Sequence, residues 1–296
     1  MPRHASRRPS QIVRSHAKIN LTLRILDRRA DGYHELRTVF QTVALHDTVT
    51  VTRRPGPFDV ACTQPGVPCD ERNLAWQAAV ALWRAAGRPG APVGAGVRIV
   101  KRIPMAAGLG GGSSNAAAAL RGLAGAWGLA MTRAELAAVG ASVGADVPFF
   151  LWGGTALGLG RGDVIYPLAD LSPAWVVLVQ PAFGVATAEA YRWYDDWTGA
   201  GRPAPSVALP AGWPFPASES GNDLEPPVAA RHPELRAIRA VLAGGRASYA
   251  AMSGSGSTVF GLFERREAAA RAARRCAREG WQAVATRTQG RLRWPG

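Results

Sequence analysis

The residues best suited to chemistry lie in one stretch, residues 101–120, which reads KRIPMAAGLGGGSSNAAAAL. Within five residues it holds four glycines: Gly108, Gly110, Gly111 and Gly112. Glycine weakens helices and strands but lets a ligand approach main-chain amides closely. Ser113–Asn115 are good N-cap residues followed by helix-forming alanines, and residues 97–103 alternate as a short strand that Pro104 ends. A glycine loop between a strand and a helix N-terminus predicts an anion site that suits phosphate.

Two familiar nucleotide-binding loops do not fit this stretch. A Walker A loop needs Gly-Lys before Ser or Thr, and the chain contains no Gly-Lys pair. A dinucleotide-binding fingerprint needs glycine at its first, third and sixth positions, but Gly108 and Gly110 are followed by Ser113 at the sixth. On these residues alone, a glycine-rich surface turn before an alanine helix remains an alternative.

Lys18 and Asn20 form a second candidate pair. Apolar residues alternate with polar ones from Ala17 to Ile25, the pattern of a half-buried strand, so Lys18 and Asn20 share its polar face about 7 Å apart. Of the 35 basic residues only Lys18 and Lys101 are lysines, which indicates positions that need a compact ammonium. The alternative is an edge strand with a solvated polar face.

Two further positions carry reactive or recognition groups. Asp146 lies in unusually apolar company, in the segment GADVPFF, where it either has a chemical role or caps a helix. Tyr33 and His34 follow a turn at Asp31–Gly32. A tyrosine face can stack on a nucleobase and an imidazole can hydrogen-bond to a pyrimidine edge, although both side chains could equally pack a loop.

The elements that must position these residues follow from hydrophobic periodicity and caps. In the first half of the chain we expect a strand at 15–25, a strand pair at 39–52, a capped helix at 73–87, the strand before the glycine loop, the helix after it at 114–127 and a helix capped by Thr132. In the second half we expect a strand at 175–179, a helix at 264–279 and a strand at 281–288. The expected loops there are a proline-rich surface loop at 199–218 and a glycine-serine loop at 252–261. A glycine-dense crossing at 153–163 marks the expected domain boundary. We therefore expect a disordered basic tail at 1–14, an N-terminal domain at 15–157 and a C-terminal domain at 158–296.

Composition narrows the class of protein. A hydrophobic fraction of 47% and no run of about 18 apolar residues predict a soluble protein without a membrane span. Three cysteines, with no Cys-x-x-Cys pair, argue against a disulfide framework or zinc site and fit a cytoplasmic location. A net charge of +14 raises nucleic acid as a partner, but the arginines are dispersed and no RNA-binding aromatic pattern is present, so we expect no specific nucleic-acid binding.

Residues 104–117, PMAAGLGGGSSNAA, resemble the phosphate loop of the GHMP kinases. The two extra glycines and the asparagine are closer to one branch, the 4-diphosphocytidyl-2-C-methyl-D-erythritol kinases of non-mevalonate isoprenoid synthesis. Further segments that resemble this branch, in its order, are AKINL at 17–21, ADGYHELRTVFQ at 30–41, GADVPFF at 144–150, PAFGVAT at 181–187, GNDLE at 221–225 and MSGSGSTVFG at 252–261. The resemblance therefore covers about residues 15 to 290.

The resemblance implies a two-domain α+β fold. Its first domain would be similar to domain 2 of ribosomal protein S5, its second would be ferredoxin-like, and the site would lie between them. The implied catalytic residues are Asp146 as base and Lys18 beside it, and the implied substrate-binding residues are Asn20, Tyr33, His34, Phe183 and Thr187. The implied contacts to the ATP phosphates are Lys101, Pro104, Met105, Ala106, Ala107, Gly108, Leu109, Gly110, Gly111, Gly112, Ser113 and Ser114.

The implied reaction uses ATP and Mg²⁺ to phosphorylate a cytidyl diphosphate sugar alcohol, and no metal ligand is assigned. The expected partner is this small molecule alone, with the protein acting as a monomer or weak homodimer. Two alternatives stay open: another GHMP kinase acting on homoserine or mevalonate, and a basic nucleic-acid-binding protein on a kinase-like fold. The first would not need Tyr33 and His34, and the second would show salt-dependent binding without ATP turnover.

Overall fold

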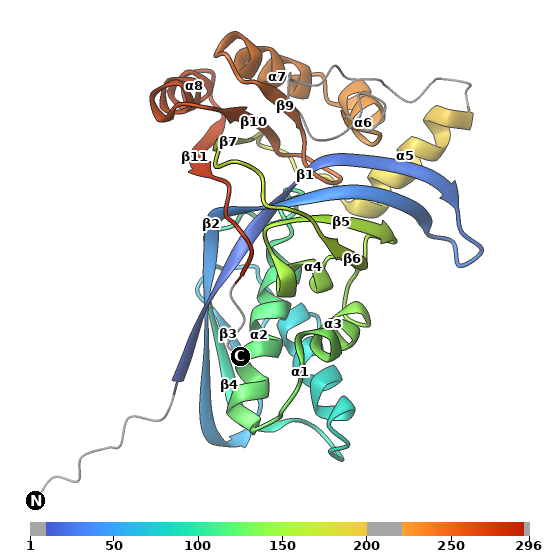
Figure 1. Cartoon of the computed structure of the whole chain (residues 1–296), viewed down its shortest axis with the longest axis vertical. Coiled ribbons are helices and arrows are strands. Elements are labelled where there is room, and N and C mark those ends of the chain that lie inside the picture. The colour runs from blue at the N-terminus through green and yellow to red at the C-terminus, as the bar shows by residue number, and fades with distance from the viewer. Residues whose placement is uncertain (1–9, 200–220, 293–296) are drawn as a thin grey trace, which may run out of the picture.

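Two β-sheets organise the chain in the computed structural model, which describes residues 10–199 and 221–292. Within these residues the larger sheet has seven strands, and its main path is β3 (Asp59–Cys62), β4 (Val93–Val100), β2 (His34–Pro57), β1 (Ser10–Arg28) and β8 (Gly221–Asn222), with β5 (Thr155–Gly160) pairing β2 and β6 (Val164–Pro167) pairing β5. The smaller sheet has the order β11 (Gln282–Arg287), β7 (Trp175–Gln180), β10 (Val259–Phe263) and β9 (Tyr249–Met252). The smaller sheet lies above the larger one in Figure 1.

The strands β1 and β2 form one long antiparallel pair, 19 and 24 residues in length, that runs through the molecule (Figure 1). The position of the predicted strand at 15–25 is confirmed as the middle of β1, where Lys18 pairs with Thr42. It is not half-buried, because Lys18 and Asn20 on its polar face are buried as well. Residues 10–14, predicted to belong to a disordered tail, instead pair with β2 from Ser10↔Thr52 onward, so that part of the prediction is wrong. Their burial explains why, since Val13 is buried whereas its neighbours Ile12 and Arg14, on the other face of the strand, are exposed. Residues 1–9 of the predicted tail lie outside the described residues.

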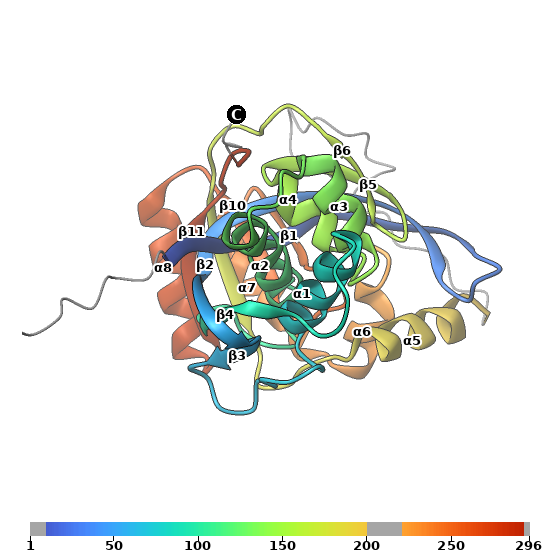
Figure 2. The same ribbon diagram turned by 90° about the horizontal axis from the view of Figure 1, so that it is seen from below.

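Four helices cover one face of the larger sheet in the described chain (Figures 1 and 2): α1 (Leu74–Ala85), α2 (Gly111–Trp127), α3 (Arg133–Ala141) and α4 (Val147–Trp152). The predicted caps of α1 and α3 are confirmed, because Asn73 accepts from the Ala75 N–H and Thr132 forms a capping box with Glu135. The helix predicted at 114–127 begins three residues earlier, after Gly110 at φ +67°. No side chain caps its first turn, so its amides are left to a ligand.

The smaller sheet is buried on both faces. On one face Val177 and Val179 pack in a cluster with the helices α5 (Thr187–Gly199), α6 (Glu225–Arg231), α7 (Glu234–Gly244) and α8 (Arg266–Arg278). On the other face Val176 and Leu178 pack against apolar side chains of β1. Burial on both faces is why the predicted strand at 175–179 reads as a continuous apolar run rather than an alternating one. The predicted arginine-rich helix at 264–279 is confirmed as α8, which buries alanines and Cys276.

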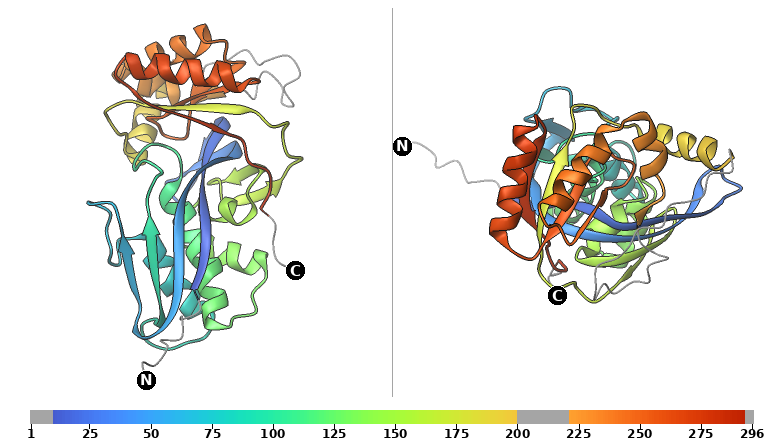
Figure 3. Two further views of the ribbon diagram at one scale, coloured as in Figure 1. Left: turned by 90° about the vertical axis from the view of Figure 1, so that its left-hand side faces the viewer. Right: turned by 90° about the horizontal axis from the view of Figure 1, so that it is seen from above.

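The two sheets pack against each other (Figure 3), and the C-terminal half of the chain also contributes a strand to the larger sheet. Strand β8, from the C-terminal half, pairs in parallel with β1 at Thr22 and Leu23. The chain changes sheet between β6 and β7, so the boundary predicted after residue 157 falls inside β5, a strand of the larger sheet. Most of the proline-rich loop predicted at 199–218 lies outside the described residues. Within the described residues, no helix is both long enough and apolar enough to span a bilayer.

Candidate active site

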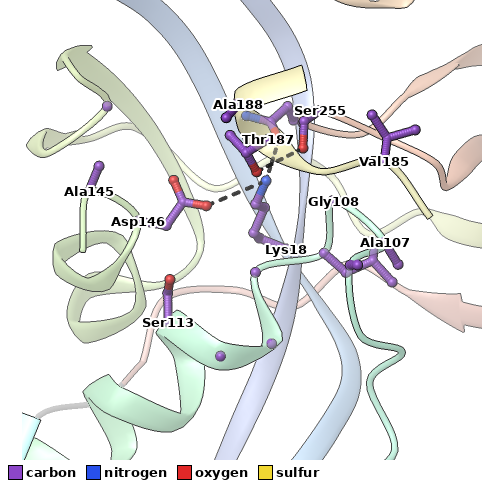
Figure 4. A pocket seen from close by; sticks show the side chains of 18 of the residues that line it. Lys18, Ala107, Gly108, Ser113, Ala145, Asp146, Val185, Thr187, Ala188 and Ser255 are labelled. Carbon is purple, nitrogen blue, oxygen red and sulfur yellow. Dashed lines mark hydrogen bonds and ion pairs between the residues drawn. The ribbon is translucent and has the colours of Figure 1, made fainter. Parts of the chain in front are cut away.

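A cavity of about 970 Å³ opens between the two sheets beside the glycine loop. Its walls come from β1, the start of β2, the loop before α2, the residues just before α4, α5 and the glycine-serine turn at Gly254–Ser255. Figure 4 shows Lys18 and Asp146 facing each other, with the glycine loop, the start of α5 and Ser255 around them. The predicted phosphate, catalytic and cytidyl segments therefore meet around a single space.

The glycine loop is held in a conformation that only small residues allow. Gly108 has φ +70°, and a Cβ built on it would clash with the Ser253 carbonyl oxygen. The Ser253 hydroxyl in turn donates to the Gly108 carbonyl at 2.9 Å. The predicted glycine-serine loop thus packs directly on the glycine loop, and Gly108 is required by this close approach.

Most of the predicted phosphate-binding residues line the cavity, namely Lys101, Pro104, Met105, Ala106, Ala107, Gly108, Leu109, Gly110, Gly111, Gly112 and Ser113. Ser114 is not among the lining residues, because its buried hydroxyl faces β1 and accepts from Ser15 Oγ at 2.7 Å. Lys101 lines the cavity, but its ammonium is paired with the buried carboxylate of Asp47. That pairing was not foreseen from the sequence.

Lys18 and Asp146 come together as predicted. Lys18 Nζ lies 3.7 Å from the Asp146 carboxylate and donates to Asn20 Oδ1 at 2.6 Å, with only 4% of its side chain exposed. The Lys18 N–H donates to the Leu109 carbonyl, which fixes the lysine beside the glycine loop. Burial lowers the pKa of the Lys18 ammonium, and the neighbouring Asp146 partly restores it. The two charges therefore support each other next to the expected phosphate site.

Asp146 precedes α4 but does not cap it through its side chain. Its carboxylate instead points toward Lys18 across the cavity (Figure 4) and remains 32% exposed. The Asn20 side-chain NH₂ group donates to Thr38 Oγ1 at 2.7 Å, and this bond orients the Asn20 side-chain oxygen toward the Lys18 ammonium. The helix-cap alternative for Asp146 therefore does not describe this carboxylate, which is free to meet a ligand.

The other end of the cavity is aromatic. His34 Nε2 donates to Asp195 Oδ1 at 2.7 Å, and the imidazole stacks on Tyr191 with ring centroids 5.0 Å apart. Tyr33 is 57% exposed, with the Arg161 guanidinium 5.2 Å from its ring centroid. All of these residues line the cavity. The predicted base-binding pair thus faces the cavity.

Sequence reasoning missed Tyr191 and Asp195, although a signal existed. Thr187, Tyr191 and Asp195 are spaced four apart in α5 and therefore share one helix face. Thr187, which was predicted, lines the cavity, and its hydroxyl oxygen lies 3.2 Å from Ser255 Oγ. The face of α5 that begins at Thr187 supplies the wall opposite β2.

Phe183, predicted as a second aromatic wall, is not among the described residues that line the cavity. Its ring stacks on His232 at a centroid distance of 4.0 Å and packs against the core cluster under α5 and α6. Apolar packing in the second domain has drawn it away from the cavity, and Tyr191 supplies the aromatic surface there instead. The prediction for Phe183 is therefore not supported.

A magnesium ion would find few protein ligands in this cavity. Among residues 10–199 and 221–292 no group of three or more His, Cys, Asp or Glu side chains is placed to hold a metal. Asp146 and Ser113 carry oxygen atoms that face the space beside the glycine loop (Figure 4). This sparse oxygen set fits Mg²⁺, which commonly enters bound to nucleotide phosphates and keeps several waters.

Comparison with known proteins identifies the family. Residues 73–154 match the GHMP kinases N terminal domain and residues 216–282 match GHMP kinases C terminal. A 4-diphosphocytidyl-2-C-methyl-D-erythritol kinase of Anaeromyxobacter sp. (strain Fw109-5) is 47% identical over 271 residues, which cover 89% of this chain and 85% of that protein. The chain belongs to this family of GHMP kinases. The corresponding protein of Moorella thermoacetica is 41% identical over 93% of the kinase described here and 97% of its own length.

Solved structures agree with this assignment. The crystal structure of a 4-(cytidine 5'-diphospho)-2C-methyl-D-erythritol kinase superposes with a TM-score of 0.73 and 35% identity, covering 95% of this kinase and 100% of that chain. A homoserine kinase from Cytophaga hutchinsonii superposes with a TM-score of 0.70 at 17% identity, covering 98% of each chain, which shows the shared fold alone. The predicted two-domain α+β GHMP kinase fold is confirmed.

Proposed function

We propose that this kinase transfers the γ-phosphoryl group of ATP to the 2-hydroxyl of 4-diphosphocytidyl-2-C-methyl-D-erythritol, in the non-mevalonate route to isoprenoid precursors. The observation that carries the proposal is the order of groups along the cavity. The glycine loop lies at one end, the Lys18–Asp146 pair lies in the middle, and Tyr33, His34 and Tyr191 lie at the other end. This order matches a nucleotide donor, a reacting alcohol and a cytosine.

The chemistry needs one base and a positively charged surrounding. The substrate hydroxyl oxygen attacks the γ-phosphorus, the bond to the β,γ-bridging oxygen breaks, and ADP leaves. Asp146 accepts the hydroxyl proton, while the buried Lys18 ammonium stabilises the charge on the transferring group. The free amides at the start of α2 hold the phosphates, and Mg²⁺ supplies neutralisation of their charge when bound.

The cytidyl end is recognised by aromatic and basic groups. Tyr33 offers a ring face to a pyrimidine, and His34 is fixed by Asp195 so that one nitrogen remains for the base edge. Arginines among the lining residues suit the diphosphate of the substrate: Arg28, Arg161 and Arg192. A homoserine or mevalonate kinase would have no use for this end.

The same proposal covers partners and location. We propose that the cavity binds small molecules, and we propose no specific nucleic-acid partner. The cysteines Cys62, Cys69 and Cys276 are all unpaired, which supports a reducing, cytoplasmic location. We propose a monomer or weak homodimer as the working form.

The test is ADP release from Mg-ATP, measured in parallel with 4-diphosphocytidyl-2-C-methyl-D-erythritol, homoserine and mevalonate. We expect turnover with the first alcohol alone. Turnover with homoserine or mevalonate instead would retain the phosphate loop but reject the cytidyl end. No turnover with any alcohol, together with salt-sensitive binding of RNA or DNA, would favour the nucleic-acid alternative.

A further inference from the structure

A buried carboxylate lies beneath the glycine loop, outside the cavity. Asp47, on β2, is 0% exposed, and its oxygens accept from four donors. Two donors are main-chain N–H groups, those of Arg102 at 2.6 Å and Ile103 at 2.8 Å. The other two are the Lys101 ammonium and the Asn115 amide, the latter at 2.9 Å. These four donors satisfy the hydrogen-bonding capacity of a carboxylate that water does not reach.

The donors come from both ends of the phosphate loop. Lys101–Ile103 immediately precede Pro104, where the loop begins, and Asn115 lies in the second turn of α2, where the loop has ended. Asn115 also donates to Ser15 Oγ at 2.8 Å, which ties α2 to β1. Asp47 therefore links the segment that precedes the loop to the helix that follows it.

The Lys101 ammonium lies directly under the first turn of α2. Its side chain is 4% exposed, and a Cβ built on Gly111 would be 3.1 Å from its Nζ. It donates to Asn115 Oδ1 at 3.3 Å and to Asp47. Without the Lys101 ammonium, the buried Asp47 carboxylate would place a negative charge below the amides to which the proposed function assigns phosphate binding. This charge would oppose the positive end of the α2 dipole.

We propose that Asp47 and Lys101 act as a neutral positioning pair for the ATP phosphates: Asp47 fixes both ends of the glycine loop, and Lys101 cancels its charge instead of contacting the phosphates. The inference rests on the proposed function, because it takes the loop as the ATP site. It assigns Lys101 a different role from the direct phosphate contact that the family resemblance implies. It also explains why a lysine occurs here although 33 of the 35 basic residues are arginines, since a compact ammonium fits under Gly111.

The test substitutes Lys101 alone and then Lys101 and Asp47 together, and measures KM for ATP in each variant. KM for the alcohol is the internal control. Lys101→Met leaves Asp47 unpaired, and we expect KM for ATP to rise roughly 10- to 100-fold from the charge beneath the site. Adding Asp47→Asn removes that charge and should restore most of the affinity. The side-chain carbonyl that remains after Asp47→Asn can still accept from the Arg102 and Ile103 N–H groups, and the Asn115 amide can turn over to accept from the introduced NH₂ group.

The opposite result identifies a direct contact. If Lys101 touches the phosphates, the double variant Asp47→Asn/Lys101→Met remains as impaired as Lys101→Met, and the proposal is overturned. Should Lys101→Met fail to fold, the double variant decides alone: replacing both members of a buried pair is often tolerated. KM for ATP within about tenfold of the parent supports neutralisation, whereas a larger loss indicates direct contact.

Two controls separate this inference from the proposed function. Parent protein that turns over the cytidyl alcohol establishes the function independently of the variants. Asn115→Ala removes one of the donors to Asp47 without changing charge, and we expect a rise of a few fold in KM for ATP with no change in KM for the alcohol. An active parent combined with an unchanged KM for ATP in Asn115→Ala and Lys101→Met would reject the positioning pair alone.

Discussion

The ion pair of Lys18 and Asp146 combines a buried ammonium with a partly exposed carboxylate. Lys18 is 4% exposed and Asp146 is 32% exposed at a separation of 3.7 Å. Burial lowers the pKa of Lys18, and Asp146 is the neighbour that keeps it charged. The carboxylate is therefore the group that can reach the substrate, and the ammonium is the buried partner beside it.

Replacing Asp146 tests its role as base. Asp146→Asn preserves the size of the side chain but cannot take a proton, so we expect kcat to fall by about 10²- to 10⁴-fold. Binding of the cytidyl alcohol, measured by calorimetry, should change by no more than a few fold because Tyr33 and His34 are untouched. A kcat close to that of the parent would show that another group, or no base at all, receives the proton.

His34 depends on α5 for its orientation. The bond from His34 Nε2 to Asp195 joins the start of β2 to the second domain, with Tyr191 stacked on the same ring. Asp195→Ala should raise KM for the cytidyl alcohol roughly 10-fold, the loss expected for one hydrogen bond to a charged group, and leave KM for ATP unchanged. Steady-state kinetics with each substrate varied in turn measure this difference.

A matched control lies one residue further along the same helix. Asp196 has a 64% exposed side chain, pairs only distantly with Arg231 and is absent from the described cavity lining. Asp196→Ala removes the same charge from the same helix, so both KM values should stay near those of the parent. Equal effects of the two substitutions would mean that helix charge, and not the orientation of His34, sets substrate affinity.

At the scale of elements, the glycine loop is shaped by contacts that differ from one glycine to the next. Gly110 has φ +67°, and a Cβ there would lie 2.6 Å from the Phe150 ring. Gly112 is helical, and its Cβ would meet only Leu74 Cδ1, at an ordinary 3.4 Å. The run of glycines therefore contains positions that need glycine and at least one that does not need it for folding.

This difference can be measured by stability alone. Gly110→Ala should lower the free energy of unfolding by about 2–4 kcal/mol, from the left-handed conformation and the clash together. Gly112→Ala should be neutral or stabilising by up to about 1 kcal/mol, because alanine is the better helix former. Urea unfolding of both variants beside the parent gives the comparison. Similar losses in the two would show that the loop relaxes and that the close approach to Phe150 is not limiting.

Elements were predicted well where one signal dominated. Asn73 and Thr132 are side-chain caps and located α1 and α3 from sequence, as the alternation around Lys18 located β1. The start of α2 was placed too late, because its N-cap is Gly110 and a glycine carries no capping side chain to recognise. The length of β1 was underestimated because Pro9 and the basic residues near it resemble a tail.

The site residues likewise differ in whether the local sequence or tertiary packing reveals their role. Lys18, Asp146 and His34 could be named because each belongs to a short motif, and the structure brings all of them to one cavity. Asp47 could not be named, because its four donors lie 54 to 68 residues away along the chain. Phe183 failed for a related reason: packing against His232, which no local pattern reveals, decides where its ring points.

At the scale of the whole molecule, the two sheets share a core. Ile19 and Leu21 of β1 pack in one cluster with Val176 and Phe260 of the smaller sheet. The Tyr249 hydroxyl, on β9, donates to the Leu21 carbonyl at 2.9 Å. The domain boundary predicted from glycine content therefore does not separate two independently packed units. Residues on both sides of that boundary line the cavity.

Because the sheets share a core, a titrating group in the β1–β2 pair should affect the stability of the whole chain. His16 lies at the bulge between these strands, facing His46 with ring centroids 5.2 Å apart and Arg14 nearby. Burial, with help from His46, lowers the pKa of His16 to about 4. Its neutral form is therefore favoured by folding, and the bond from its Nδ1 to the Val43 carbonyl only partly opposes this.

The sign of the pH dependence follows from these values. Above pH 6.5 His16 is neutral in both the folded and unfolded states, and its contribution to stability is constant. Between pH 6.5 and about 4 only the unfolded state takes up the proton, so stability falls as pH falls, by up to about 3 kcal/mol. His16→Asn should remove this slope, and the difference between parent and variant in urea unfolding at pH 7 and pH 5 isolates it from the carboxylates. Parallel pH profiles for the two proteins would mean that the pKa of His16 in the folded chain is close to that in the unfolded chain, which would contradict the effect of burial argued above.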